Sequence, residues 1–198
     1  MSDKPGFLAA KAPSAPTVKK SVRPGPAELP IPQAEAHRPA PGSYVVEVNL
    51  KPEFADAAGL AALRMLHGAG IAAARGVRVG RLYDLRGPLN LGHVHVALRE
   101  LLCDCVTQEF RLCHGAVAAS PNSAERWRVE VWLKPAVADT AADSVRAALG
   151  DLGMPEVAVR CGLAYHIAAK CGRGQLDKAV ARSLANPAIH LILVHEDR

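Results

Sequence analysis

Residues 129–135 read Val-Glu-Val-Trp-Leu-Lys-Pro, and residues 46–52 read Val-Glu-Val-Asn-Leu-Lys-Pro. The two heptapeptides lie 83 positions apart and differ at one place. In each, the aliphatic residues Val, Val and Leu take every second position, other side chains lie between them, and a proline follows. This pattern is typical of a strand with two different faces. A strand sequence that recurs at a long offset indicates a repeated structural unit.

The match continues beyond the prolines at nearly the same offset. Val77-Arg78-Val79-Gly80 corresponds to Val159-Arg160-Cys161-Gly162. Further pairs are Asp56 with Asp139, Leu66 with Leu149, Gly70 with Gly153, Tyr83 with Tyr165 and Leu85 with Ile167. We interpret the chain as two copies of one unit in tandem.

The first unit is predicted to run strand, helix, strand, helix, strand. Strands are expected at 44–50, 77–85 and, more weakly, 109–117, and Asp56 is a plausible N-cap for the first helix. Apolar stripes predict the buried helix faces: Leu60, Leu63 and Leu66 in the first helix, and Leu91, Val94, Leu98, Leu101, Leu102 and Cys105 in the second.

The second unit repeats this order. Strands are expected at 127–133, 157–169 and 188–195. Ala142, Val145, Leu149 and Leu152 mark one helix, and Leu176, Ala179, Val180 and Leu184 mark the other. The predicted fold class is therefore α+β, with helices packed on one face of antiparallel or mixed, ferredoxin-like sheets. The expected divisions are a disordered Ala/Pro/Lys-rich tail at 1–42, repeat one at 43–118, a linker at 119–126 and repeat two at 127–198.

The face of the sheet away from the helices is expected to be partly apolar. In the closing strand, Leu191 and Leu193 face one way, whereas Ile192 and Val194 face the other; Trp132 is likewise opposite Val131. We assign Ile192, Val194 and Trp132 to this second face, which needs a cover from the sister repeat or from another chain.

The bulk composition excludes several classes of protein. The net charge of +5 is scattered and aromatics make up 4%, which does not favour nucleic-acid binding. No apolar run approaches the ~20 residues of a membrane span. The odd count of five cysteines predicts reduced thiols and a cytoplasmic protein.

These motifs resemble the PurS family, the small subunit of phosphoribosylformylglycinamidine (FGAM) synthase. That family has a V-x-V-x-L-K-P strand, a D-P-x-G helix start, a V-R-V-G-K strand and an L-x-N-P-x-I ending. Both heptapeptides fit the first motif, Asp56 to Gly59 fits the second without its proline, Asp139 to Ala142 keeps only the aspartate, and residues 77–81 fit the third. Residues 184–189 fit the ending closely, while 102–107 fit it poorly. The insert at 87–90 stands where the family has an acidic extended strand.

The resemblance implies a non-catalytic accessory subunit of FGAM synthase in de novo purine biosynthesis. Its partners would be an ATP-dependent synthetase (PurL-like) subunit and a glutaminase (PurQ-like) subunit, which it bridges. ATP, Mg²⁺ and glutamine would be used by the complex, with no cofactor bound by this chain. The repeats would pair as an intramolecular pseudo-dimer, or the chain would form a homo-oligomer. The alternative is a ferredoxin-like regulatory module that binds a small molecule.

The candidate interface residues combine the two repeated motifs with the expected second sheet face. They are Lys51, Pro52, Arg78, Tyr83, Trp132, Lys134, Pro135, Arg160, Tyr165, Ile192 and Val194. Strand-end charges are the ordinary explanation for the lysines, and interface contact is the alternative.

Other candidate sites are less specific. Cys103, Cys105, Cys113 and His114 have zinc-ligand chemistry, but the first two are expected on one helix at a spacing that does not share a face. His93 and His95 have the same spacing. Residues 171–174 (Cys-Gly-Arg-Gly) precede a helix and could hold a phosphate, although a turn is the ordinary explanation.

Overall fold

The first strand, β1 (Ser43–Leu50), places the first five residues of the first heptapeptide inside a sheet, one strand in from its edge. The computed structural model describes residues 42–113 and 126–197, and these fall within one unit of the chain. The predicted tail and linker lie outside the described residues, apart from Gly42 and Arg126 at their ends.

Helix α1 (Ala57–Gly68) follows β1 and begins at the predicted N-cap. Asp56 Oδ1 accepts the N–H of Gly59 at 2.7 Å, which satisfies one of the free donors of the first turn. The buried face consists of Gly59, Ala62 and Leu66, whereas Leu60 is 54% exposed. The prediction that Leu60 belongs to the core is therefore wrong, because the helix is rotated so that Ala62 faces the sheet.

Strand β2 (Ala74–Arg86) is longer than predicted, and the helix after it is not uniform. An α-helical segment, α2 (Leu91–Ala97), continues into a π-helical segment, η1 (Leu98–Leu102). The wider π turn shifts the buried stripe to Val94, Ala97, Leu98 and Leu102. Leu91, Leu101 and Cys105, predicted on the buried face, are exposed. Strand β3 (Gln108–Cys113) ends this half, and the rest of the predicted strand, 114–117, lies outside the described residues.

The second half contains β4 (Arg126–Leu133), α3 (Thr140–Asp151), β5 (Ala158–Ala169), α4 (Arg173–Ser183) and β6 (His190–Asp197). Asp139 caps α3 as Asp56 caps α1, with the Ala142 N–H donating to Oδ1 at 2.9 Å. Leu152 is exposed because α3 ends at Asp151.

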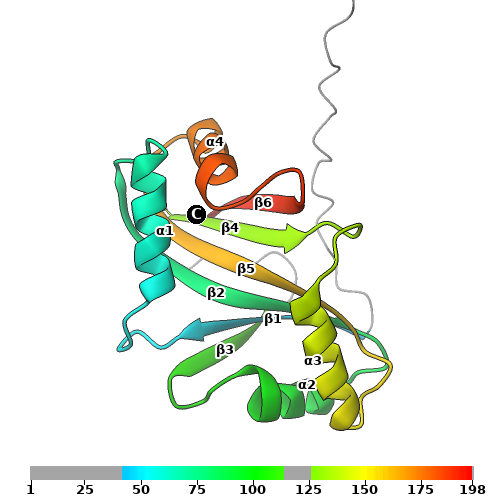
Figure 1. The fold of residues 1–198 in the computed structure, drawn as a ribbon. Helices are drawn as coiled ribbons and strands as arrows, with labels where there is room; N and C mark the ends of the chain where they lie inside the picture. Colours follow the sequence, from blue (N-terminus) through cyan, green and yellow to red (C-terminus); the bar gives the residue numbers. More distant parts are fainter. Residues whose placement is uncertain (1–41, 114–125, 198) are drawn as a thin grey trace, which may run out of the picture. The chain divides into compact units, whose positions relative to one another are not determined.

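The six strands within the described residues form one antiparallel sheet in the order β3-β1-β2-β5-β4-β6 (Figure 1). The halves join through β2 and β5, whose register centres on Arg81 opposite Leu163. Gly80 faces Ala164 and Leu82 faces Gly162, so corresponding motif positions lie symmetrically about this centre. The α+β fold class is confirmed.

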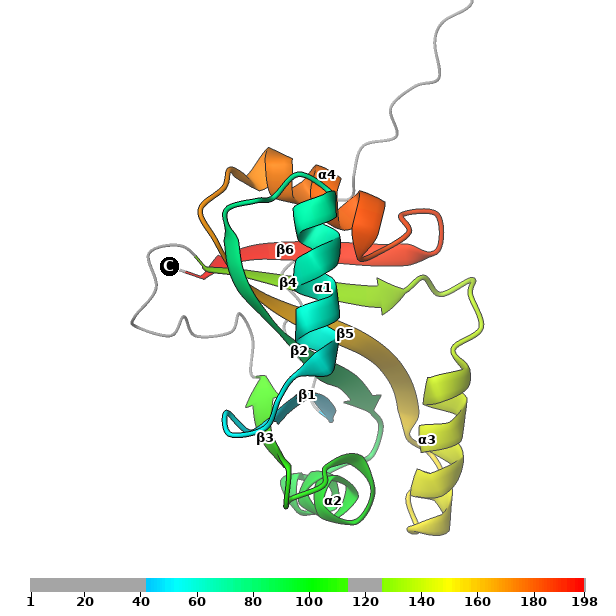
Figure 2. The same cartoon turned by 60° about the vertical axis from the view of Figure 1, so that its left-hand side comes forward.

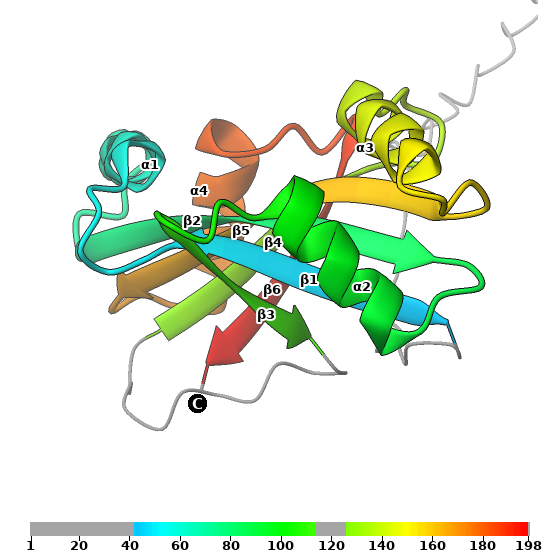
Figure 3. The ribbon, with the colours of Figure 1, turned by 90° about the horizontal axis from the view of Figure 1, so that it is seen from below.

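Helices α1, α3 and α4 lie above the strands in Figure 3, and together with α2 and η1 they form two cores that each combine both halves. The first core joins α1 of the first half with α4 of the second, which lie side by side in Figure 2. The second core joins α2 and η1 with α3. Large apolar side chains such as Leu66 and Leu149 are fully buried there, each worth roughly 1.5–3 kcal/mol of transfer free energy. Neither half therefore has a hydrophobic core of its own.

Candidate functional site

The sheet face away from the helices carries a third apolar cluster beside a charged network. Leu82, Ala164 and Trp132 are buried there, with Val45, Leu191 and Leu193 packed against them. The expectation of a partly apolar second face is right for Trp132. It is wrong for Ile192 and Val194, which pack in the first core on the helix side. Register explains the error, because Trp132 pairs with Leu191, whereas Val131 pairs with Ile192.

Two glycines allow the neighbouring strands to pack on this face. A Cβ on Gly162 would lie 2.7 Å from the Trp132 ring, and a Cβ on Gly80 would overlap the Asn49 side-chain oxygen. Asn49 and Trp132 occupy the one variable place of the two heptapeptides. The glycine of each V-R-x-G motif therefore lies directly under the side chain at the variable place of a heptapeptide.

The charged network is centred on Glu47, whose side chain is fully buried in β1. Its carboxylate contacts Arg111 Nη2 at 2.9 Å and His166 Nε2 at 2.5 Å, and it forms an ion pair with Arg128. Asn49 Nδ2 donates to Oε1 at 2.9 Å. These partners come from β3, β5, β4 and β1, so one carboxylate connects four strands. Neighbouring strands of a flat sheet lie ~4.8 Å apart, and two strands, β2 and β5, separate β1 from β4. Because side chains of β1 and β4 nevertheless meet, this face of the sheet is concave.

The electrostatics of Glu47 follow from this arrangement. Burial alone would raise the pKa of the carboxyl group, but the hydrogen bond from His166 and the charge of Arg128 outweigh it and hold the pKa far below its ordinary value. Glu47 is therefore an anion that is neutralised internally. Such a group suits a structural role better than proton transfer.

Arg128 extends the network toward Trp132. Its Nε donates to Glu130 Oε1 at 3.0 Å and its Nη2 lies 2.9 Å from the same oxygen. The alignment at Nη2 is too poor for a hydrogen bond, so this buried nitrogen is held by charge alone. Glu130 Oε2 accepts from the Trp132 indole N–H at 3.0 Å. Sequence reasoning missed this network, although the repeated glutamate of V-E-V was its available signal.

The repeated lysines and arginines predicted for an interface form internal contacts. Lys51 Nζ donates to the carbonyls of Cys105 and Val106 at 2.8 and 2.9 Å, and Lys134 Nζ donates to that of Pro187 at 2.6 Å. In both halves the lysine therefore fastens the turn before the last strand.

The paired arginines close the first strand of each half. Arg78 Nη2 donates to the carbonyl of Leu50, and Arg160 Nη2 donates to that of Leu133 at 3.3 Å. The Arg160 guanidinium also lies 5.5 Å from the centre of the Trp132 ring. Pro52 and Pro135 are exposed, while Tyr83 and Tyr165 are 7% exposed within the helix-side cores. Among the candidates, the structure thus brings Arg160 against Trp132, and Arg78 Nη2 also donates to the Lys51 carbonyl at 3.3 Å.

The two capping aspartates make one further matching contact. Asp56 Oδ2 accepts the Val79 N–H at 2.8 Å, and Asp139 Oδ2 accepts the Cys161 N–H at 2.9 Å. Each carboxylate thus joins a helix start to the strand behind it.

The cysteines and histidines do not assemble a metal site within 42–113 and 126–197, where no group of three or more His, Cys, Asp or Glu side chains could hold an ion. Cys103 and Cys105 follow η1 in a turn rather than lying on a helix, which corrects the prediction. Burial raises the pKa of Cys103 to about 11 and that of Cys161 to about 12, so both thiols stay protonated at neutral pH. His114 lies outside the described residues.

The histidines of α2 have local partners. Asn90 and His93 form a reciprocal cap at the helix start, and the His95 ring meets that of Phe110 edge-on. Residues 171–174, considered above as a turn or a phosphate site, lead into α4 (Arg173–Ser183). Gly172 is the N-cap of this helix and makes no side-chain cap contact.

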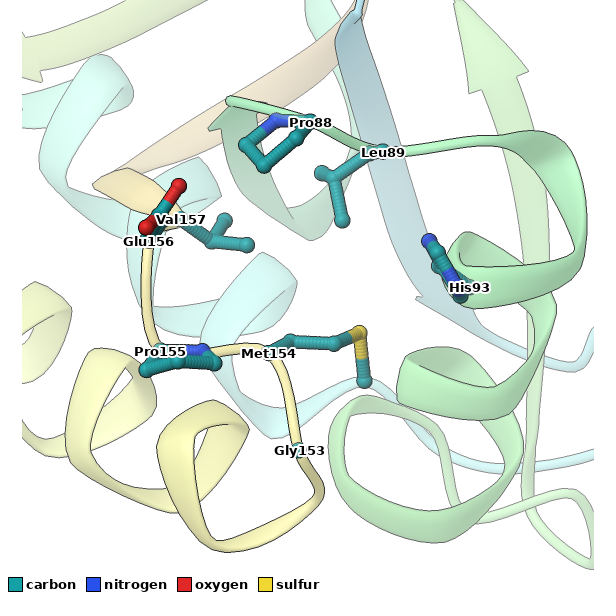
Figure 4. A pocket seen from close by; sticks show the side chains of 8 residues that line it. All are labelled: Pro88, Leu89, His93, Gly153, Met154, Pro155, Glu156 and Val157. Carbon is teal, nitrogen blue, oxygen red and sulfur yellow. The ribbon is translucent and has the colours of Figure 1, made fainter.

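A small pocket lies between the loop after β2 and the loop before β5 (Figure 4). Leu89, Met154 and Val157 project into it, with His93 and Glu156 at its border. Its volume is about 130 Å³, whereas sites for drug-sized ligands occupy roughly 300–1,000 Å³. The pocket is therefore large enough for a single ring and too small for a nucleotide.

Residues 126–196 match the PurS family model, described as phosphoribosylformylglycinamidine (FGAM) synthase. The PurS match begins at β4 and ends within β6, so it covers the second half of the sheet and both of that half's helices. No curated protein matches the chain. Among the described helices, none is long and apolar enough to cross a membrane.

Proposed function

We propose that this protein is a non-catalytic accessory subunit of FGAM synthase, built from two PurS-like units in tandem. The PurS match of 126–196 supports the role in purine biosynthesis for the second unit. The first unit is assigned on geometry. The observation that carries it is the set of contacts made by corresponding residues, which recurs in both halves.

Three contacts make up this set. The lysine of L-K-P fastens the turn before the last strand, the arginine of V-R-x-G closes the first strand, and the capping aspartate binds a helix and a strand together. Corresponding residues make each of these contacts between corresponding strands, helices and turns of the two halves. Independent evolution of three such contacts would be a coincidence, and duplication of one unit accounts for all of them.

The tandem arrangement suggests what the subunit does. A single chain carries both halves of a pseudo-dimer, with their sheets joined edge to edge at β2 and β5. In the proposed complex it bridges a synthetase (PurL-like) and a glutaminase (PurQ-like) subunit. Binding of the second subunit to a chain that already holds the first is effectively intramolecular, which raises the local concentration. ATP, Mg²⁺ and glutamine are used by the partner subunits.

The test is a reconstitution of glutamine-dependent FGAM synthesis. The purified synthetase and glutaminase subunits from the same organism are assayed with ATP, Mg²⁺ and glutamine, with and without this chain. We expect glutamine-dependent activity to require the chain, and ammonia-dependent activity of the synthetase to need it much less. Full glutamine-dependent activity without the chain would overturn the proposal.

A further inference from the structure

The outer face of α1 differs in chemistry from its counterpart in the second half. Leu60 is 54% and Met65 45% exposed, and Ala57, Ala58 and Ala61 on the same helix are also exposed. Spacings of three and four residues align these side chains along one side of a twelve-residue helix. The result is a mostly apolar stripe turned away from the core, and the exposed Arg64, four residues after Leu60 and three after Ala61, lies on the same side.

Helix α3 provides an internal comparison. Both helices have twelve residues, start one residue after a capping aspartate, and bury a leucine at the tenth position. Leu60 and Ala61 of α1 correspond to Asp143 and Ser144 of α3. Asp143 is exposed and pairs with Arg146, as expected for a helix face in contact with water. The fold therefore does not require apolar residues at these positions.

The charges around α1 are predominantly basic. Helix α1 has no acidic residue, and Arg64 on its surface is exposed. Its neighbour α4 exposes Arg173, Lys178 and Arg182 and a single acid, Asp177. By contrast, the surface of α3, α2 and η1 balances Arg99 and Arg146 with Glu100, Asp143 and Asp151. Among the helices that the structure describes, only α1 and α4 combine an apolar stripe with an excess of positive charge.

We propose that the stripe formed by Ala57, Leu60, Ala61 and Met65 is a docking surface for another protein. The partner presents an apolar ridge bordered by acidic side chains. Apolar contact supplies the affinity and the basic surroundings select the acidic partner. A second copy of this chain does not fit, because like charges would face each other at α1 and α4. This proposal goes beyond the proposed function and does not require it.

The test uses site-specific photocrosslinking of the full chain in its own cells. A photoreactive p-benzoylphenylalanine replaces Leu60 or, as the matched control, Asp143, and crosslinked peptides are identified by mass spectrometry. We expect position 60 alone to crosslink to one protein, through a segment that contains both apolar and acidic residues. In a binding assay with that purified protein, Leu60→Asp should weaken affinity about tenfold or more, and added salt should weaken it further.

The outcomes separate this proposal from the proposed function. A crosslink to the synthetase or glutaminase subunit supports both, and a crosslink to an unrelated acidic protein supports the docking surface alone. If position 60 gives no crosslink, only crosslinks to another copy of the chain, or the same products as position 143, the docking surface is wrong. The reconstitution of activity would then still decide the proposed function.

Discussion

Glu47 and His166 belong to different halves of the chain, yet their side chains meet at 2.5 Å across the intervening strand β2. This contact is possible because the sheet is curved, so that side chains on its concave face converge. The same carboxylate holds Arg128 and Arg111, and the network thereby fixes how the two halves of the sheet curve toward each other.

Removal of the central carboxylate should be severe. Glu47→Leu leaves Arg128 buried beside Glu130 alone, and loss of one partner of a buried pair costs about 3–5 kcal/mol. Urea unfolding measures the free energy. Glu109→Gln, at an exposed position on β3, is the control and should change stability by less than about 0.5 kcal/mol. Equal stabilities of the two variants would show that the network does not hold the sheet.

Stability should fall in acid because of the same residue. The pKa of Glu47 is lowered in the folded state, so the folded protein binds fewer protons than the unfolded chain. Its contribution is complete above the ordinary value of 4.5 and is lost as the pH falls toward the folded-state pKa. Urea unfolding between pH 6 and pH 3 should show a steeper loss for the natural protein than for Glu47→Gln. Parallel curves would contradict this assignment.

Two glycines should respond to alanine in opposite directions. Gly162→Ala places a methyl group 2.7 Å from the Trp132 ring and 2.9 Å from the Val131 carbonyl oxygen, which should cost about 1–3 kcal/mol. Gly150→Ala, near the end of α3, meets no atom within 4 Å and should stabilise by roughly 0.5–1 kcal/mol. Thermal melting of both variants is sufficient, and a stable Gly162→Ala protein would mean that Trp132 moves freely.

The halves should not fold separately as monomers. One core needs both α1 and α4, and the other needs both α2 and α3. A fragment of 42–117 or of 126–198 therefore exposes its part of both cores. We expect each fragment to be unfolded or self-associated by circular dichroism and light scattering, and their mixture to restore a one-to-one complex. A monomeric, cooperatively melting fragment would contradict the shared-core arrangement.

The thiols should differ in reactivity. Cys105 is exposed, whereas burial raises the pKa of Cys103 to about 11 and of Cys161 to about 12. A thiol reagent at pH 7.5 should therefore modify Cys105 first, and Cys105→Ser should remove the fastest phase. Cys161→Ala is the control and should leave that phase intact.

The α+β order and the helix caps could be predicted from the sequence because their causes are local. Alternation in the two heptapeptides, prolines after the strands and an aspartate before α1 and α3 act within a few residues. The burial of α1 was predicted less well. Its more hydrophobic residue, Leu60, is exposed, whereas the less hydrophobic Ala62 is buried. The π-helical segment at Leu98–Leu102 was missed for a similar reason, since it depends on how α2 and α3 meet over the sheet.

The repeated motifs by themselves determined which residues correspond, and corresponding residues make the same local contacts. Tertiary structure decided that β2 pairs with β5, that each core takes helices from both halves, and that Glu47 meets His166 and Arg128. The register of β4 and β6 puts Ile192 and Val194 on the helix side of the sheet, and it puts Trp132 and Leu191 together on the other side. The physical reason is that strand pairing and sheet curvature join residues far apart in the chain, up to 119 positions for Glu47 and His166, and no local pattern specifies their register.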